Sequence, residues 1–125
     1  MKKDHNIIVS ATPTYLEDRS APDRAQFVFA YTINIENQGN LAAKLLARHW
    51  VITDSEGQVE EVRGPGVVGE HPHLQPGESF RYTSGTVLKT PLGFMSGSYQ
   101  MRDEKGHLFD ATIPTFTLTA SVVFH

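Results

Sequence analysis

The chain has 125 residues, 39% of them hydrophobic and 20% charged, which is typical of one folded domain spanning residues 1–125. Its net charge is −3, and the sequence shows no surplus of Lys and Arg of the kind that nucleic-acid-binding proteins display, so we expect no nucleic-acid partner. The absence of cysteine excludes disulfides and thiol catalysis and favours a cytoplasmic location, and no apolar run approaches the ~20 residues that cross a membrane.

The N-terminal third alternates with a period of two, which predicts strands with one apolar and one wet face. The stretch "IIVSAT" is a short example, and "QFVFAYTINIEN" is a long one. One-sided burial of this kind is typical of antiparallel sheets. The apolar positions of the longer stretch are Phe27, Phe29, Tyr31, Ile33 and Ile35.

The next segment, "NLAAKLLARHW", contains good helix formers, so a helical turn competes with a strand that begins at about Leu45. Within it, Arg48 lies in register with Leu46, Trp50 and Ile52. We interpret Arg48 as an aliphatic stem packed beside the core with its charged head in water. The alternative is a guanidinium that holds a carboxylate or carbonyl between the sheets.

Turn signals separate the remaining strands. The stretches "DSEG" (Asp54–Gly57) and "DEKG" (Asp103–Gly106) both place Asp first and Gly fourth, as a type I turn favours. This spacing predicts an all-β fold, an immunoglobulin-like or fibronectin-type-III-like β-sandwich of seven to eight antiparallel strands. In the last expected strand the apolar face consists of Phe116, Leu118, Ala120, Val122 and Phe124.

Three glycines, Gly64, Gly66 and Gly69, have the G-x-G-x-x-G spacing of dinucleotide-binding proteins. That motif needs a helix after the glycines, and Pro72 and Pro76 break any such helix. A P-loop would need Lys directly after Gly69, where this chain has Glu.

Two interpretations of the glycines remain. Their amides could form an anion nest for a nucleotide or pyrophosphate, with Arg63 as the nearest cation. Alternatively, the glycines only allow a sharply turned loop with positive φ angles, and this is the interpretation that we favour.

Metal binding and catalysis have weak signals. His71 and His73 form an H-x-H pair that could share one ion, but a site needs three or four ligands, so we interpret them as solvated side chains. Ser84 and Ser96 precede glycines without forming G-x-S-x-G. We therefore expect no metal, no cofactor and no enzymatic activity.

One stretch, "TPLGFMSG", brings Leu92, Phe94 and Met95 together with small residues. If this apolar loop is exposed, it is a candidate surface for a partner protein. Edge strands of a sandwich can also pair with another chain, and such pairing could equally produce a homodimer.

The motifs "GPGVVGE", "LQPGESFRYTSG", "TPLGFMSGSYQM" and "IPTFTL" together resemble the bacterial ApaG (CorD) family over most of residues 48–118. The resemblance implies a fibronectin-type-III-like sandwich. It also implies links to cobalt resistance, magnesium efflux and a dinucleoside-polyphosphate hydrolase, and related domains act as protein-recognition modules. It assigns no catalytic residue.

Taken with the residues, the resemblance predicts a non-catalytic module that binds an unidentified protein partner in a role linked to divalent-cation homeostasis. The alternative function is a small-ligand binder that takes a nucleotide or pyrophosphate at residues 64–69.

Overall fold

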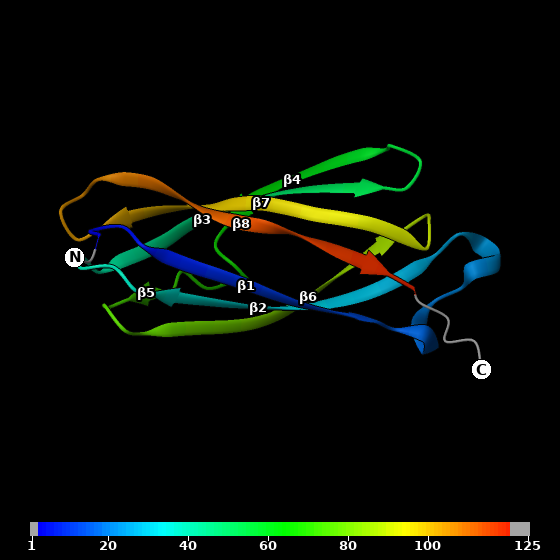
Figure 1. Cartoon of the computed structure of the whole chain (residues 1–125), viewed down its shortest axis with the longest axis horizontal. Coiled ribbons are helices and arrows are strands. Elements are labelled where there is room, and N and C mark those ends of the chain that lie inside the picture. Colours follow the sequence, from blue (N-terminus) through cyan, green and yellow to red (C-terminus); the bar gives the residue numbers. More distant parts are fainter. Residues whose placement is uncertain (1–2, 121–125) are drawn as a thin grey trace.

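The structure, a computed structural model, describes residues 3–120 and consists of two antiparallel sheets packed face to face (Figure 1). One sheet has the order β1-β2-β6, and the other has the order β4-β3-β7-β8 with β5 paired to β3. The predicted all-β sandwich is confirmed. The strands are β1 (Ile7–Tyr15), β2 (Phe27–Asn37), β3 (Ala43–Asp54), β4 (Val59–Pro65), β5 (His73–Leu74), β6 (Ser79–Leu88), β7 (Leu92–Asp103) and β8 (Leu108–Thr119).

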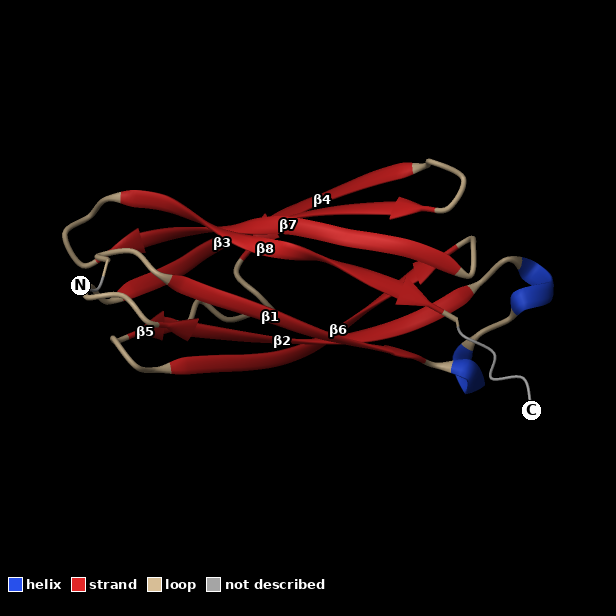
Figure 2. Cartoon of the chain, in the orientation of Figure 1, coloured by secondary structure: helices blue, strands red, loops and turns tan. Residues whose placement is uncertain are grey.

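The only helical elements among the described residues are two single 3₁₀ turns between β1 and β2, η1 (Glu17–Arg19) and η2 (Pro22–Arg24) (Figure 2). Neither turn buries a residue. Between residues 3 and 120 we find no helix with the length and apolar character of a membrane span.

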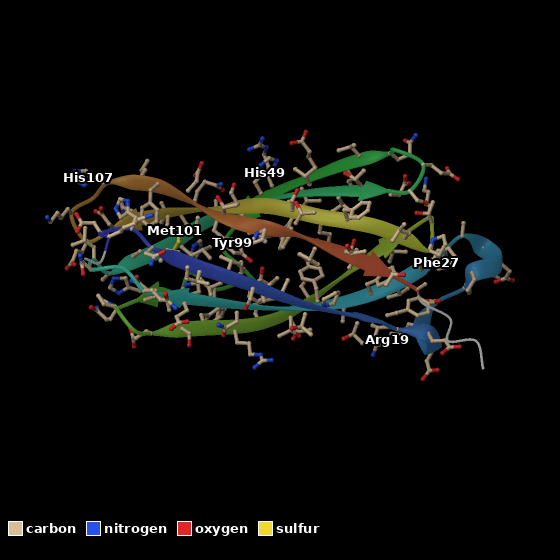
Figure 3. All side chains as sticks on the ribbon, in the orientation of Figure 1. Arg19, Phe27, His49, Tyr99, Met101 and His107 are labelled. Atoms are coloured by element: carbon tan, nitrogen blue, oxygen red, sulfur yellow. The ribbon has the colours of Figure 1, made fainter. Side chains whose placement is uncertain are left out.

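The core lies between the sheets and is built from the alternating positions. On the predicted inner face of β2, Phe27 is partly buried and the other four apolar residues are buried. The ring of Trp50 packs edge-on against Tyr31, with 5.3 Å between ring centroids. In Figure 3, Tyr99 and Met101 lie between the sheets, whereas His49 points away from them. The apolar rings of the two layers therefore meet at Trp50.

The ambiguous segment is a strand from Ala43, two residues before the expected start, and contains no helical turn. The ladder with β7 shifts register between Leu45 and Ala47, a β-bulge. Leu45 is consequently fully buried, whereas Leu46 is only partly buried. Arg48 does share a face with Trp50 and Ile52, but the predicted alignment with Leu46 is wrong because the bulge reverses the alternation.

A second register shift lies in the pairing of β7 with β8, between Met95 and Gly97. Strand β8 is one long element, in which Ile113 pairs with Gly97 and Phe116 with Met95. Pro114, which has no amide hydrogen for the ladder, lies in the interval between the paired residues. Val122 and Phe124, which we predicted to continue the apolar face, lie outside the described residues.

Both predicted Asp-x-x-Gly turns form. The amide of Gly57 donates to the carbonyl of Asp54 at 3.2 Å, and the amide of Gly106 donates to the carbonyl of Asp103 at 2.9 Å. Each aspartate also accepts two backbone amides through its side chain. The two turns thus have the same pattern of hydrogen bonds.

Candidate functional site

The candidate site is an open cleft between β4 and β6, the strands that form the sheet edges on one side of the sandwich. Two adjoining cavities of about 330 and 310 Å³ form it. A further cavity of about 230 Å³ extends the groove toward the turn at Asp54. The residues that line both of the adjoining cavities are Tyr31, Arg48, Trp50 and Ser84.

The cleft exists because the two sheets differ in width. The β4-β3-β7-β8 sheet has one more long strand than the β1-β2-β6 sheet. Strand β4 contains no buried residue, and its Glu60 and Val62 side chains line the cleft. The inner face of β4 therefore lacks a covering strand.

Arg48 is the central polar side chain of the cleft. Its Nη1 atom donates one hydrogen bond to the carbonyl oxygen of Pro65 and one to that of Gly66, both at 2.9 Å. Among the described residues it forms no ion pair with a carboxylate. The guanidinium therefore does not simply reach into water. It holds two carbonyl groups, as in the alternative interpretation, but these belong to the end of β4 and the loop after it and not to the opposite sheet.

The three predicted glycines have three separate structural roles. A Cβ atom at Gly64 would lie 2.9 Å from Nη2 of Arg48, so glycine makes room for the guanidinium. Gly66 has a φ of +60°, and a Cβ there would overlap the carbonyl oxygen of Glu70. Gly69 has a φ of +80° in open space. The G-x-G-x-x-G spacing therefore reflects a fold requirement at each position.

The amides of this loop are largely occupied by the backbone itself. The amide of Gly66 donates to the carbonyl of Leu46, and Val67 and Glu70 exchange a pair of backbone hydrogen bonds. An anion nest needs free amides, and here the carbonyl groups, not the amides, face the nearby cation. The side chain of Arg63 is 71% exposed and lies 3.9 Å from Glu61.

At the tip of the loop, Val68 has a φ of +43°, an outlier for a β-branched residue. Val68 and Gly69 form a two-residue turn in which both φ angles are positive, as in a type I′ turn. The Val68 side chain is 54% exposed and lines the cleft. Val68 therefore combines backbone strain with an exposed apolar side chain at the mouth of the cleft.

Two tyrosine hydroxyls join the sheets beneath the cleft. The hydroxyl of Tyr82 on β6 hydrogen-bonds to that of Tyr99 on β7. Burial raises the pKa of Tyr82 to about 12, and burial together with the neighbouring Tyr82 raises the pKa of Tyr99 further. Both phenols are therefore neutral at physiological pH, and they tie β6 to the opposite sheet.

The two predicted metal-ligand candidates do not assemble a site. His71 is exposed, with its Nδ1 atom 3.1 Å from the carbonyl oxygen of Leu45, and His73 lies on β5. Within residues 3–120 no group of three or more His, Cys, Asp or Glu side chains could hold a metal ion.

The predicted apolar loop is part of strand β7. Leu92 and Phe94 are 38% and 40% exposed, whereas Met95 is buried at 1%. Alternation along the strand separates them, so Met95 belongs to the core and only Leu92 and Phe94 remain at the surface.

Sequence reasoning missed a buried carboxylate. The Asp103 side chain accepts a hydrogen bond from His5 at 2.7 Å, and His107 Nδ1 lies 3.4 Å away. Burial alone would raise the pKa of Asp103, but the bonds from His5 and from two backbone amides, with the charge of His107, lower it to about 2. His5 and Asp103 are 98 positions apart in the sequence, and no local pattern links them.

The sequence signature of the ApaG domain matches residues 17–103. The protein ApaG of Thiobacillus denitrificans is 54% identical over 123 residues, which cover 98% of this chain and 97% of that protein. The chain belongs to the ApaG family. The protein ApaG of an Azoarcus species is 56% identical over 121 residues, covering 97% of this chain and 95% of the relative.

The fold agrees with that of a solved relative. The crystal structure of the ApaA protein from Bordetella pertussis superposes with a TM-score of 0.92 at 48% identity, covering 95% of this chain and 97% of that one. The match to the ApaG family thus extends beyond the motifs of residues 48–118 to nearly the whole chain.

Proposed function

We propose that this member of the ApaG family is a non-catalytic module that binds a segment of a partner protein in the cleft between β4 and β6. The observation that carries the proposal is the form of the cleft, an open groove that follows two strand edges. Within residues 3–120 these edges are free and Arg48 has no carboxylate partner. A groove that runs from the glycine loop past Arg48 to the turn at Asp54 matches an extended chain better than a compact small molecule.

The composition of the groove supports the same function. Arginine, tyrosine and tryptophan are the residues most often found at the energetic centre of protein interfaces. Here Arg48 stands over a floor that includes Tyr31 and Trp50, both nearly buried and therefore rigid. The family resemblance implies a role in divalent-cation homeostasis. In this proposal the chain has that role through its complex with the partner and not through a metal site of its own.

The proposal can be tested with a single introduced thiol, because the chain has no cysteine. A benzophenone maleimide is attached to Ser84→Cys in the cleft or to Ser10→Cys, an exposed residue of β1 on the other edge of the same sheet. After irradiation in a cell extract, we expect the cleft variant to give a defined cross-linked protein that the control does not give.

The nucleotide alternative is measured alongside. Pyrophosphate, ATP and diadenosine tetraphosphate are expected to leave the melting temperature unchanged. A melting temperature that rises with one of these ligands, combined with identical cross-linking from both cysteines, would contradict the proposal.

A further inference from the structure

We infer that the partner segment binds as an additional β-strand on the free edge of β6, with an acidic residue facing Arg48. This inference rests on the proposed function and specifies how the cleft is used. The edge of β6 that does not pair with β2 is open in the described chain, so it offers unpaired amide and carbonyl groups.

The unequal sheets decide which edge accepts the strand. A strand added to β6 would widen the β1-β2-β6 sheet and lie opposite β4, whose inner face has no buried residue. It would thereby cover Glu60 and Val62, which line the cleft. A strand added to β4 would extend the wider sheet further and leave the cleft open.

The free donors of Arg48 indicate which group of the partner binds there. A guanidinium carries five N–H donors, and the two of Nη1 already bind the carbonyls of Pro65 and Gly66. The donors of Nη2 and Nε have no acceptor among the described residues. A carboxylate can take both donors at once in a bidentate pair, which is the strongest neutral-pH partner for this group.

The pairing of β3 with β4 places a second charge along the groove. Arg48 pairs with Gly64, and Ile52 pairs with Glu60, so Glu60 lies four residues along from the guanidinium, about 13 Å at the rise of a strand. Val62 and Trp50 lie between them. Because inward side chains alternate, the expected partner pattern is an acidic residue, an apolar residue two positions away and a basic residue four positions away.

The strands of the chain do not supply this segment. None of the strands β1 to β8 has the pattern in either direction. A partner of different sequence is therefore favoured over a second copy of the chain.

The test uses a phage-displayed library of random 12-residue peptides, selected on the full-length protein. We expect peptides with the acidic, apolar and basic pattern, and binding of one synthetic peptide should slow amide hydrogen exchange in residues 79–88 of β6. Arg48→Gln should weaken binding roughly tenfold to a hundredfold, as expected for the loss of a charge-assisted pair. The matched control Arg63→Gln, an exposed arginine on the outer face of β4, should leave affinity unchanged.

Four outcomes would overturn the inference: no selected peptide, peptides without an acidic residue, slowed exchange in β4 but not in β6, or slowed exchange in β6 that depends on protein concentration without peptide. The last would assign the edge to a second copy. Cross-linking from Ser84→Cys can succeed in each of these cases, so failure of the strand-addition mode is distinguishable from failure of the proposed function.

Discussion

The guanidinium of Arg48 on β3 lies directly against the backbone of Gly64 on β4, so closely that its Nη2, Cζ and Nη1 atoms are the three nearest neighbours of a Cβ placed at residue 64. The same guanidinium binds the next two carbonyl groups of the chain, at Pro65 and Gly66. Arg48 and the glycine loop are therefore one structural unit. This unit fixes the wall of the cleft and the position of its positive charge.

The contact predicts that the effect of Gly64→Ala on the free energy of unfolding changes sign when Arg48 is removed. In the natural background, Gly64→Ala should lower the free energy of unfolding by about 1–2 kcal/mol, because the guanidinium must move and its bonds weaken. In an Arg48→Ala background the crowding is absent, and the same change should stabilise by about 0.5–1 kcal/mol, since alanine loses less entropy than glycine in a strand. Urea unfolding of the four proteins measures both effects, and equal effects in the two backgrounds would disprove the contact.

Alanine substitutions at Gly66 and Gly69 test the geometry of the loop. Both have positive φ angles, so alanine should cost about 1 kcal/mol of stability at Gly69, where the added Cβ meets open space. At Gly66 the Cβ would also meet the carbonyl oxygen of Glu70, and we expect at least about 1 kcal/mol more. Thermal unfolding of the two variants compares them, and equal losses would argue against this loop geometry.

Val68 offers a stabilising substitution. Val68→Asn creates an Asn-Gly pair, the preferred sequence of a type I′ turn, and should raise the free energy of unfolding by about 1–2 kcal/mol through relief of strain. Val87→Asn at an equally exposed strand position (56%) is the control and should give no gain. Chemical denaturation would contradict the strain at Val68 if both variants lost stability.

The contacts of Asp103 with His5 and His107 predict that part of the free energy of unfolding is lost in acid. The folded pKa of about 2 lies below the ordinary value of 3.8, so the ionised carboxylate favours the folded state above about pH 4, and this contribution is lost as the pH falls toward 2. Asp103→Asn should flatten the dependence of the free energy of unfolding on pH between 4 and 2.

Asp54→Asn is the matched control for that variant, because Asp54 makes the same turn bonds without a histidine contact. At pH 7 we expect Asp103→Asn to destabilise more than Asp54→Asn. An unchanged slope between pH 4 and pH 2 in the Asp103 variant would show that folding does not lower the pKa of this carboxyl.

The fold was largely predictable from the sequence because alternation and turn chemistry are local. The inner face of β2 and both Asp-x-x-Gly turns follow from residues that are neighbours in the chain. The bulge at Leu46 was not predictable, because a single unpaired residue reverses the alternation without altering composition. The register shift in β8 between Ile113 and Phe116, where Pro114 lies, was not predictable for the same reason.

The site was predictable only in part. The spacing of the glycines is visible in the sequence, but the need for glycine at residues 64 and 66 comes from Arg48 and Glu70, which lie close to them only in the folded chain. Tyr31 and Trp50 have the pattern of core residues, and only the different widths of the two sheets place them at the floor of a cleft. Sheet width depends on long-range pairing, which one sequence does not reveal.

The cleft at Arg48, and not the glycine loop amides or Arg63, is the proposed binding site for the partner. The most direct measurement is the dissociation constant of the protein captured through Ser84→Cys, determined by calorimetry for the natural chain, Arg48→Gln and Arg63→Gln. We predict that Arg48→Gln weakens binding about tenfold or more and that Arg63→Gln has no effect. Equal affinity of the natural chain and Arg48→Gln, or a loss confined to Arg63→Gln, would show that the partner does not bind in the cleft at Arg48.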